Sequence, residues 1–176
     1  MITIKAELSP SSIDKAIDEI NKYKSRLQDR IQSLVNELVQ DGVQVAGILV
    51  SSAQGDSKKP DVTYEVNPQG DIVNATIAIV GTDVLFIEFG AGIAYNTGNV
   101  HPKASEFGYG PGTYPSKHPP NKAINPGYWY YTDYDNAGQK TSKRSIGTEA
   151  TMPMYHAAET IRNNLIQKAI DNFMRG

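Results

Sequence analysis

One long apolar stripe constrains this chain more than any other feature. From residue 13 to residue 38, aliphatic side chains recur every three or four positions, with Lys24 as the one interruption. This spacing places them on one face of an α-helix, which turns once every 3.6 residues. The members are Ile13, Ile17, Ile20, Leu27, Ile31, Leu34 and Leu38, and Val45 and Leu49 continue in phase. Ser9 and Pro10 precede the stripe, and both residue types favour a helix start, Ser9 as the capping residue.

The length of this helix decides how it can be covered. If it runs from Ser11 to about Val50, it is roughly 60 Å long at about 1.5 Å per residue, longer than a compact domain of this size is wide. A helix that overhangs its own domain needs burial elsewhere, and a neighbouring copy is the simplest source. Alternatively, Gly42 or Gly47 bends or ends the helix near Asp41, so that it packs only on its own sheet.

Alternating patterns predict the strands of the core. Apolar and polar residues alternate at residues 2–8, which indicates a short strand. The same alternation at residues 62–66 and 72–80 flanks turn-forming residues 67–71, which is typical of a β-hairpin. One face of its second strand carries Val73, Ala75, Ile77 and Ile79, and we expect the long helix to cover it.

A second helix is expected near the carboxyl end. Thr151 and Pro153 precede a three-four spacing of apolar residues, which predicts a helix start there. Its apolar face consists of Met154, Ala158, Ile161, Leu165, Ala169 and Phe173. The pattern therefore predicts an α+β fold: a long N-terminal helix and a C-terminal helix packed on a small, mostly antiparallel β-sheet.

A long aromatic insertion interrupts this core. The segment from Ala91 to Gly147 holds seven of the ten tyrosines, the only tryptophan, six of the ten prolines and eight of the fifteen glycines. Disordered segments are poor in aromatic residues, so we expect an ordered loop. Residues 128–133 have strong β propensity, and residues 135–138 can turn the chain into residues 139–144 as an exposed hairpin. We expect a single domain, residues 1–176, with its core at 1–90 and 147–176 and the insertion at 91–146.

Composition excludes several classes of protein. The formal net charge of −2 lacks the basic field of a dedicated DNA-coating protein. Without cysteine there is no disulfide, thiolate nucleophile or cysteine-ligated metal. The first ten residues do not resemble a signal peptide, and no apolar run is long enough to span a bilayer. We expect a soluble protein made in the cytoplasm, without a membrane partner.

The sequence offers weak candidates for chemistry. Gly90 and Gly92 begin a pattern like a dinucleotide-binding loop, but Tyr95 occupies the third glycine position and residues 96–99 disfavour the required helix.

His101, Glu106 and His118 share a loop without a known metal-ligand spacing. His156 and Glu159 suit a surface pair on the second helix. We therefore expect no enzyme, no catalytic residue, no cofactor and no metal.

Glu88 lies within an apolar run that ends at Gly90 and Gly92. A buried carboxylate is costly unless it accepts backbone N–H bonds or pairs with a cation. We interpret Glu88, with Phe89, Gly90 and Gly92, as a structural anchor that fixes where the insertion leaves the core. Its acceptor bonds would come from the glycine turn, or its partner would be Arg144 or Arg162. The alternative is a surface strand residue.

The aromatic hairpin also permits binding to nucleic acid. Lys140, Lys143 and Arg144 follow Trp129 and Tyr130, which together offer cations and stacking surfaces for a single strand. Three cations on an acidic chain also suit an ordinary solvated face. A nucleic-acid-binding module is therefore the alternative function.

Three motifs appear in order after the long helix and hairpin: IEFGAG at residues 87–92, GYWYYTD at 127–133 and MPMYHAA at 152–158. In this order the chain resembles the small tail-completion or neck proteins of tailed bacteriophages, the head-to-tail joining family often described as minor tail proteins. Such proteins usually have threonine at the position of Ala91 and a shorter segment than residues 96–125.

The resemblance implies a structural protein of the virion, located at the neck or tail end and made in the host cytoplasm. It implies an oligomeric ring that contacts other neck and tail proteins, while DNA passes through without specific binding. Cyclic rings use two different patches per subunit, which suggests the long helix on one side and the aromatic hairpin on the other. The candidate interface residues are Ile13, Ile17, Ile20, Leu27, Tyr128, Trp129, Tyr130, Tyr131, Met154 and Tyr155.

Overall fold

The structure, a computed structural model, describes residues 7, 9–53, 59–92, 100–111, 129–134 and 137–174. Its elements are α1 (Pro10–Ser52), β1 (Asp61–Gln69), β2 (Ile72–Val80), α2 (Val84–Phe89), β3 (Ala91–Gly92), the 3₁₀ helix η1 (Ser105–Phe107), β4 (Gly110–Pro111), β5 (Trp129–Tyr134), β6 (Lys140–Ser145) and α3 (Pro153–Met174). The strand expected at residues 2–8 falls outside the described residues except for residue 7, so it stays a prediction.

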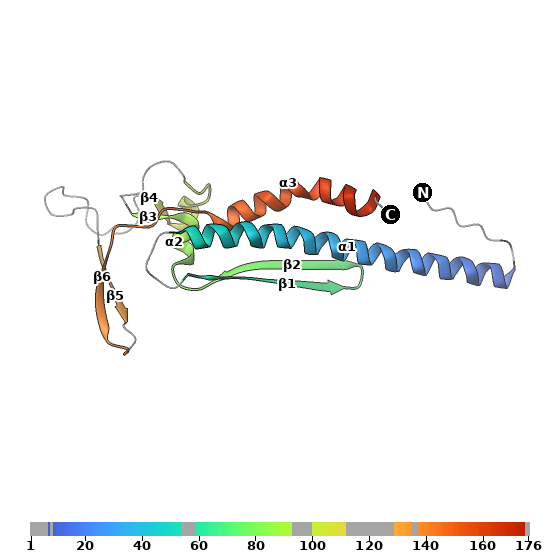
Figure 1. The fold of residues 1–176 in the computed structure, drawn as a ribbon, viewed down its shortest axis with the longest axis horizontal. Coiled ribbons are helices and arrows are strands. Elements are labelled where there is room, and N and C mark those ends of the chain that lie inside the picture. Colours follow the sequence, from blue (N-terminus) through green and yellow to red (C-terminus); the bar gives the residue numbers. More distant parts are fainter. Residues whose placement is uncertain are drawn as a thin grey trace.

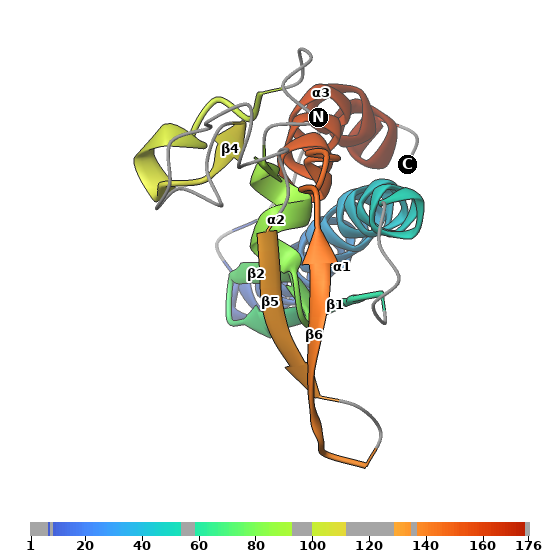
Figure 2. The ribbon, with the colours of Figure 1, turned by 90° about the vertical axis from the view of Figure 1, so that its left-hand side faces the viewer.

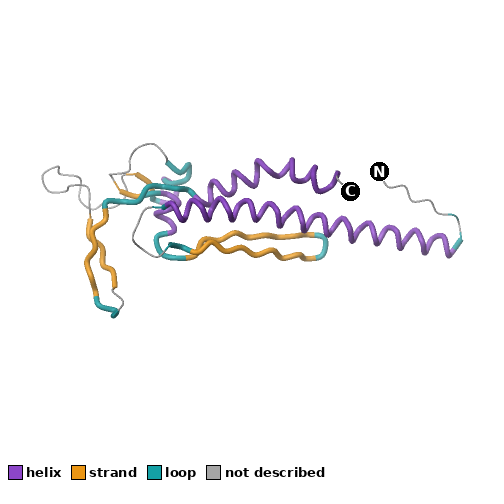
Figure 3. The backbone as a smooth tube through the Cα atoms, in the orientation of Figure 1, coloured by secondary structure: helices purple, strands orange, loops and turns teal. Residues whose placement is uncertain are grey.

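Helix α1 runs without interruption for 43 residues. It starts with Pro10 in its first turn and Ser9 at the N-cap position, both as expected, but the Ser9 side chain does not make the expected capping hydrogen bond. Figure 3 shows α1 as one extended purple coil. The alternative of a helix that ends near Asp41 is wrong.

Gly42 explains why α1 continues through a residue that usually weakens helices. A Cβ atom at Gly42 would lie 2.7 Å from Cδ1 of Ile77 and 2.8 Å from Cδ1 of Ile161. The absent side chain therefore lets β2 and α3 approach α1 closely. The packing gained there offsets the roughly 1 kcal/mol that glycine costs inside a helix relative to alanine.

The antiparallel pair β1–β2 lies along one side of α1. Its register runs from Asp61 opposite Val80 to Gln69 opposite Ile72, so only Gly70 and Asp71 form the turn. The expected turn at residues 67–71 is therefore too long. Gln28 Nε2 donates to Asp71 Oδ1 at 2.7 Å, and Lys24 Nζ lies 3.1 Å from the same oxygen. These contacts attach the hairpin tip to α1 at residues 24–28.

Helix α3 covers another side of α1. Asn164 Nδ2 donates to Asp41 Oδ2 at 2.7 Å, and Lys168 Nζ donates to Asp41 Oδ1 at 3.0 Å. Near its carboxyl end, Arg30 Nη1 donates to the Phe173 carbonyl at 3.2 Å. The buried residues of the two helices are Leu34, Leu38, Val39, Gly42, Ala46 and Val50 in α1, and Pro153 and Ala157 in α3. Toward its carboxyl end, the apolar stripe of α1 therefore forms part of the buried core.

The architecture is a mixed α+β arrangement of a long N-terminal helix, a C-terminal helix and a small antiparallel hairpin, as the sequence predicts. Figure 1 shows α3 and the β1–β2 hairpin on opposite sides of α1, and the first turns of α1 extending past both. Figure 2, a view turned by 90°, shows the β5–β6 hairpin projecting away from α3. The described part of the insertion also includes a short parallel pair, β3 with β4.

Asp41 gives the packing of α3 on α1 a dependence on acid. Burial raises the pKa of Asp41, but the hydrogen bonds of Asn164 and Lys168 and the charge of Lys168 outweigh it and hold the pKa below its ordinary value of 3.8. The folded-state pKa is depressed, so this contribution to stability is present above the unfolded-state pKa and lost as pH falls through the folded-state value.

We therefore expect the wild-type protein to lose more stability between pH 6 and pH 3 than the Asp41→Asn variant loses. Urea unfolding followed by circular dichroism at both pH values measures the two losses. Equal losses in the two proteins would show that Asp41 does not contribute to the acid sensitivity.

Candidate functional site

Glu88 is buried at the centre of contacts between α2, α3 and the insertion. It lies on helix α2 and keeps 7% of its surface exposed. Its Oε2 accepts the backbone N–H of Met154 at 2.9 Å, and its Oε1 accepts the backbone N–H of Tyr155 at 2.9 Å. The carboxylate therefore binds two of the N–H groups that the start of a helix leaves without an intrahelical acceptor.

Helix α3 depends on this outside carboxylate because its own sequence supplies no capping side chain. Met152, the residue before Pro153, has no side-chain oxygen and has a positive φ of 51°. The Thr151 hydroxyl, two residues before the helix, is buried without a hydrogen-bond partner. A negative charge at a helix N-terminus is also favoured by the helix dipole. Glu88 thus caps the N-terminus of α3, which the residues directly before the helix do not cap.

His101 completes the surroundings of Glu88. Its Nε2 lies 3.3 Å from Glu88 Oε1, and both side chains are buried. Its Nδ1 accepts the backbone N–H of Lys103 at 3.0 Å, so the proton of the neutral ring is on Nε2 and faces the carboxylate. From the sequence, His101 is either a metal ligand or a packed or solvated loop residue, and its contact with Glu88 is not predicted.

These contacts correct the expected environment of Glu88. Its partners are the first turn of α3 and His101, so Arg144 and Arg162 as partners are wrong, and so are acceptor bonds from the glycine turn. The alternative of a surface strand residue is also wrong, because Glu88 is buried in a helix. Backbone N–H groups, one of the two kinds of partner expected, satisfy the carboxylate, but they belong to the first turn of α3.

Phe89 connects α2 to the start of the insertion. Its ring stacks on Phe107 at a centroid distance of 5.2 Å and on Tyr109 at 5.7 Å, and meets His101 edge-on at 4.5 Å. Phe86 meets Tyr109 edge-on at 5.7 Å. Such pairs add about 0.5–1.5 kcal/mol beyond the area they bury. Neighbouring residues of α2 therefore hold α3 through Glu88 and the insertion through Phe89.

The two ends of the insertion meet beside this cluster. The backbones of Ala91 and Thr148 exchange two hydrogen bonds of 2.9 Å. Gly92 has φ of 90° and Gly147 has φ of 114°, and a Cβ at Gly92 would lie 2.7 Å from the Cα of Gly147. Gly90, with φ of 74°, ends α2. The glycines of the IEFGAG motif therefore allow the chain to enter the insertion directly beside the point where it leaves.

We expect Gly92→Ala to lower the free energy of unfolding by about 3 kcal/mol, because the new Cβ would contact backbone atoms at a positive φ. Gly108→Ala is the matched control, since Gly108 also has a positive φ, 71°, but no atom of the described residues other than its chain neighbours lies within 4 Å of its Cβ position. We expect that control to lose only about 1 kcal/mol, the cost of backbone strain. Chemical denaturation measures both, and equal losses would contradict the close approach.

The first 14 residues of α1, residues 10–23, form what we name the overhang. Ile13, Ile17 and Ile20 leave 46%, 49% and 53% of their surfaces exposed, and Tyr23 is also exposed. At 100° per residue, the charged residues of the overhang lie on the opposite half of the helix. These are Asp14, Lys15, Asp18, Glu19 and Lys22. The overhang therefore presents an uncharged apolar ridge to its surroundings.

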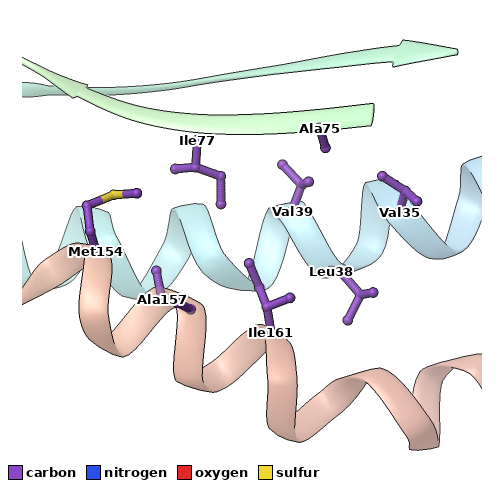
Figure 4. Close-up of a pocket in the computed structure, with 9 residues that line it drawn as sticks. Val35, Leu38, Val39, Ala75, Ile77, Met154, Ala157 and Ile161 are labelled. Carbon is purple, nitrogen blue, oxygen red and sulfur yellow. The ribbon is translucent and has the colours of Figure 1, made fainter. Parts of the chain in front are cut away.

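Farther along α1, an apolar groove opens between α1, β2 and α3. Its volume is about 320 Å³, and its lining contains no charged residue. Figure 4 shows Ala75 and Ile77 pointing from β2 toward α1, and Ile161 pointing into the same space from α3. The lining consists of Val35, Leu38, Val39, Ala75, Ile77, Met154, Ala157, Ala158 and Ile161. We name these residues the groove.

The remaining expected interface residues fall in several places. Leu27 is half-buried on α1, Met154 lines the groove, and Tyr155 is half-buried with its ring 5.3 Å from that of His101. The Glu159 carboxylate raises the pKa of Tyr155, chiefly through a side-chain hydrogen bond. Tyr128 and the side chains of Trp129 and Tyr131 lie outside the described residues, and Tyr130 is exposed on β5.

The β5–β6 hairpin confirms the expected pairing of its two segments. Tyr130 is opposite Arg144, and Tyr134 is opposite Lys140. Directly opposed residues of an antiparallel pair share a face, so two tyrosines and two cations lie on one side of the hairpin. All four side chains are exposed. This face has the residues expected for contact with an anionic or aromatic partner.

The other candidate metal ligands and acid–base residues do not form a site among the described residues. Among the described residues, no group of three or more histidine, cysteine or acidic side chains could hold a metal ion, and His118 lies outside them. His156 Nδ1 lies 3.4 Å from Glu159 Oε2, the surface pair that the sequence predicts. In the same part of the chain, no helix has the length and apolarity to cross a bilayer.

Comparisons of the chain with models of protein families, with curated proteins and with solved structures find no match. The surfaces and contacts of the chain itself therefore carry the functional argument.

Proposed function

We propose that this protein is a structural component of a tailed-phage virion, which forms a ring at the neck or tail end and acts in tail completion and head-to-tail joining. The proposal joins the resemblance of the three ordered motifs with the surfaces described above. Its role is assembly, so its working parts are contact surfaces.

The observation that most supports this proposal is the exposed apolar ridge of the overhang. Fully burying an isoleucine stabilises a protein by about 1.5–3 kcal/mol, so covering the exposed halves of Ile13, Ile17 and Ile20 would contribute about 1 kcal/mol each. The tip of the β1–β2 hairpin bonds through Gly70 and Asp71 to α1 at residues 24–28, which lie beyond the overhang. A helix that extends an apolar ridge beyond its own core is typical of a subunit that is covered by another molecule.

The anchor at Glu88 supports the same role. Glu88 joins α2 to the start of α3 and to His101, and the adjacent Ala91–Thr148 pair holds the two ends of the insertion together, so the β5–β6 hairpin leaves the core at a defined position. In a ring, the α1 ridge would contact a neighbouring subunit, and the projecting hairpin would contact adjoining neck or tail proteins. A mildly acidic chain, with net charge −2, also suits a passage through which DNA slides without being held.

Deletion of the gene from the phage that carries it tests the proposal. We expect filled heads and separate tails to accumulate, and purified protein added to such an extract to restore infectious particles. Electron microscopy and plaque counts measure the two effects. Intact infectious virions formed without the protein would overturn the proposal. Portal and major tail genes on either side of this gene would support it.

A second candidate is a nucleic-acid-binding module. The observation that favours it is the exposed face of the β5–β6 hairpin, where Tyr130 lies opposite Arg144 and Tyr134 opposite Lys140. Stacking on an aromatic ring contributes about 1–3 kcal/mol per base. Fluorescence anisotropy with a single-stranded oligonucleotide tests it. Binding that weakens with salt and disappears in Trp129→Ala and Tyr130→Ala would favour this module over the virion role.

A further inference from the structure

The overhang is an apolar ridge, and the groove is an apolar depression on the same helix. Among the residues that the structure describes, the overhang has an apolar ridge without walls beside it, whereas the groove has a floor on α1 and walls on β2 and α3 but no described residue over it. Both lie on the same apolar face of α1, because Ile13, Ile17 and Ile20 are in helical phase with Leu38 in the groove floor. Each copy of the chain therefore carries both an apolar ridge and an apolar groove.

We propose that the overhang of one copy occupies the groove of a second copy of this chain. This inference rests on the proposed self-association and assigns the surface that receives the long helix. The sequence had suggested the aromatic hairpin for that surface.

The dimensions of the two surfaces match. From Ile13 to Ile20 is seven residues, about 10 Å along a helix, and from Met154 to Ile161 on the groove wall is also seven residues. Isoleucines at positions i, i+4 and i+7 form the ridge by which an amphipathic helix fits an apolar groove. With Tyr23, the ridge exposes on the order of 300 Å² of apolar surface, within the size range of the largest patches on monomeric proteins, which are often functional.

The positions of the charged residues are also compatible with docking of the overhang in the groove. The groove lining contains no charged side chain, and the charges of the overhang face away from its ridge. Docking therefore buries no unpaired charge, which would otherwise oppose association. The Ala75 and Ala158 side chains at the rim are exposed and small, so they leave room for larger side chains to enter.

A chain cannot fill its own groove in this way. Helix α1 is unbroken, and Ile17 precedes the groove residues Val35 to Val39 by at least 18 positions, roughly 27 Å along the helix. An overhang that occupies the groove therefore comes from another molecule, and a second copy supplies the required ridge in equal number. Because ridge and groove are different surfaces, repeated docking can close a ring.

Disulfide trapping tests the docking directly, because the natural chain has no cysteine. We expect the double variant Ile17→Cys/Ala158→Cys to form disulfide-linked dimers and larger species under mild oxidation, seen on a non-reducing gel. A disulfide requires Cα atoms about 4.4–6.8 Å apart, so this pair can form only between molecules. The matched control, Asp18→Cys/Ala158→Cys, moves the overhang cysteine to the opposite half of the helix and should not cross-link.

A second variant separates docking from folding. Ala158→Phe should place a ring of the chain's own in the groove, which we expect to weaken association at least tenfold by light scattering while the thermal unfolding temperature stays equal or rises. If the natural protein associates but the Ile17 pair fails to cross-link and Ala158→Phe still associates, the groove assignment is overturned and the proposed assembly stands. If the natural protein stays a monomer at all concentrations, both proposals fall.

Discussion

The Glu88→Ala variant is expected to lose about 3–5 kcal/mol of its free energy of unfolding. The change leaves the backbone N–H groups of Met154 and Tyr155 without their acceptor, and it leaves the Nε2–H of His101 facing a cavity. An unsatisfied buried donor costs about 1–3 kcal/mol, and three are affected. Chemical denaturation monitored by circular dichroism measures the loss.

The Glu88→Gln variant distinguishes the charge from the shape of the side chain. Its amide group keeps one oxygen but presents N–H donors where the site needs acceptors, so we expect a loss of about 2–3 kcal/mol. Glu106→Ala is the matched control, because Glu106 is exposed on η1, and it should change stability by less than about 0.5 kcal/mol. A Glu88→Ala protein within 1 kcal/mol of wild type would contradict the capping role.

The triple variant Ile13→Ala/Ile17→Ala/Ile20→Ala is expected to remain folded and to lose self-association. Covering the exposed parts of these side chains contributes about 3 kcal/mol or more to a contact, so their loss weakens association by about 100-fold or more. Alanine is the best helix former, so the change does not weaken α1 itself. Light scattering measures association, and circular dichroism verifies the helix content.

The matched control for this variant is Asp14→Ala/Asp18→Ala/Lys22→Ala, three alanines on the opposite half of the same turns. We expect it to associate like the natural protein, because these residues lie away from the ridge. If both triple variants associate equally well, the ridge is not the contact surface. If both dissociate, the effect belongs to the overhang as a whole and contradicts a role specific to the isoleucines.

Much of the fold could be predicted because it depends on local periodicity. The apolar stripe of α1, the alternation in β1 and β2, and Pro153 at the start of α3 each correspond to an element of the structure. The predicted ends of the helices and strands were less accurate. Gly42 left two helix lengths open, because its compatibility with the helix depends on Ile77 and Ile161, which lie far away in the sequence.

The burial of Glu88 followed from its apolar neighbours, but its partners did not. Met154 is 66 residues away, and it contributes a backbone N–H, which residue identity does not reveal. One signal was present. A helix that starts at Met152-Pro153 without a capping side chain needs an acceptor from elsewhere, and a carboxylate in an apolar run is a natural candidate. The apolar faces of the three elements that form the groove were predicted, but the groove itself was not, since these faces meet only in the folded chain.

Whether copies of the chain cover the ridge of α1 is decided by the mass of the purified natural protein in solution. One chain has a mass of 19.2 kDa. If the ridge of α1 is covered by copies of the same chain, multi-angle light scattering should give a multiple of this mass that rises with concentration to a fixed ring size. A mass of one chain at every concentration, up to those at which the protein is soluble and in the presence of phage tails, would contradict the account.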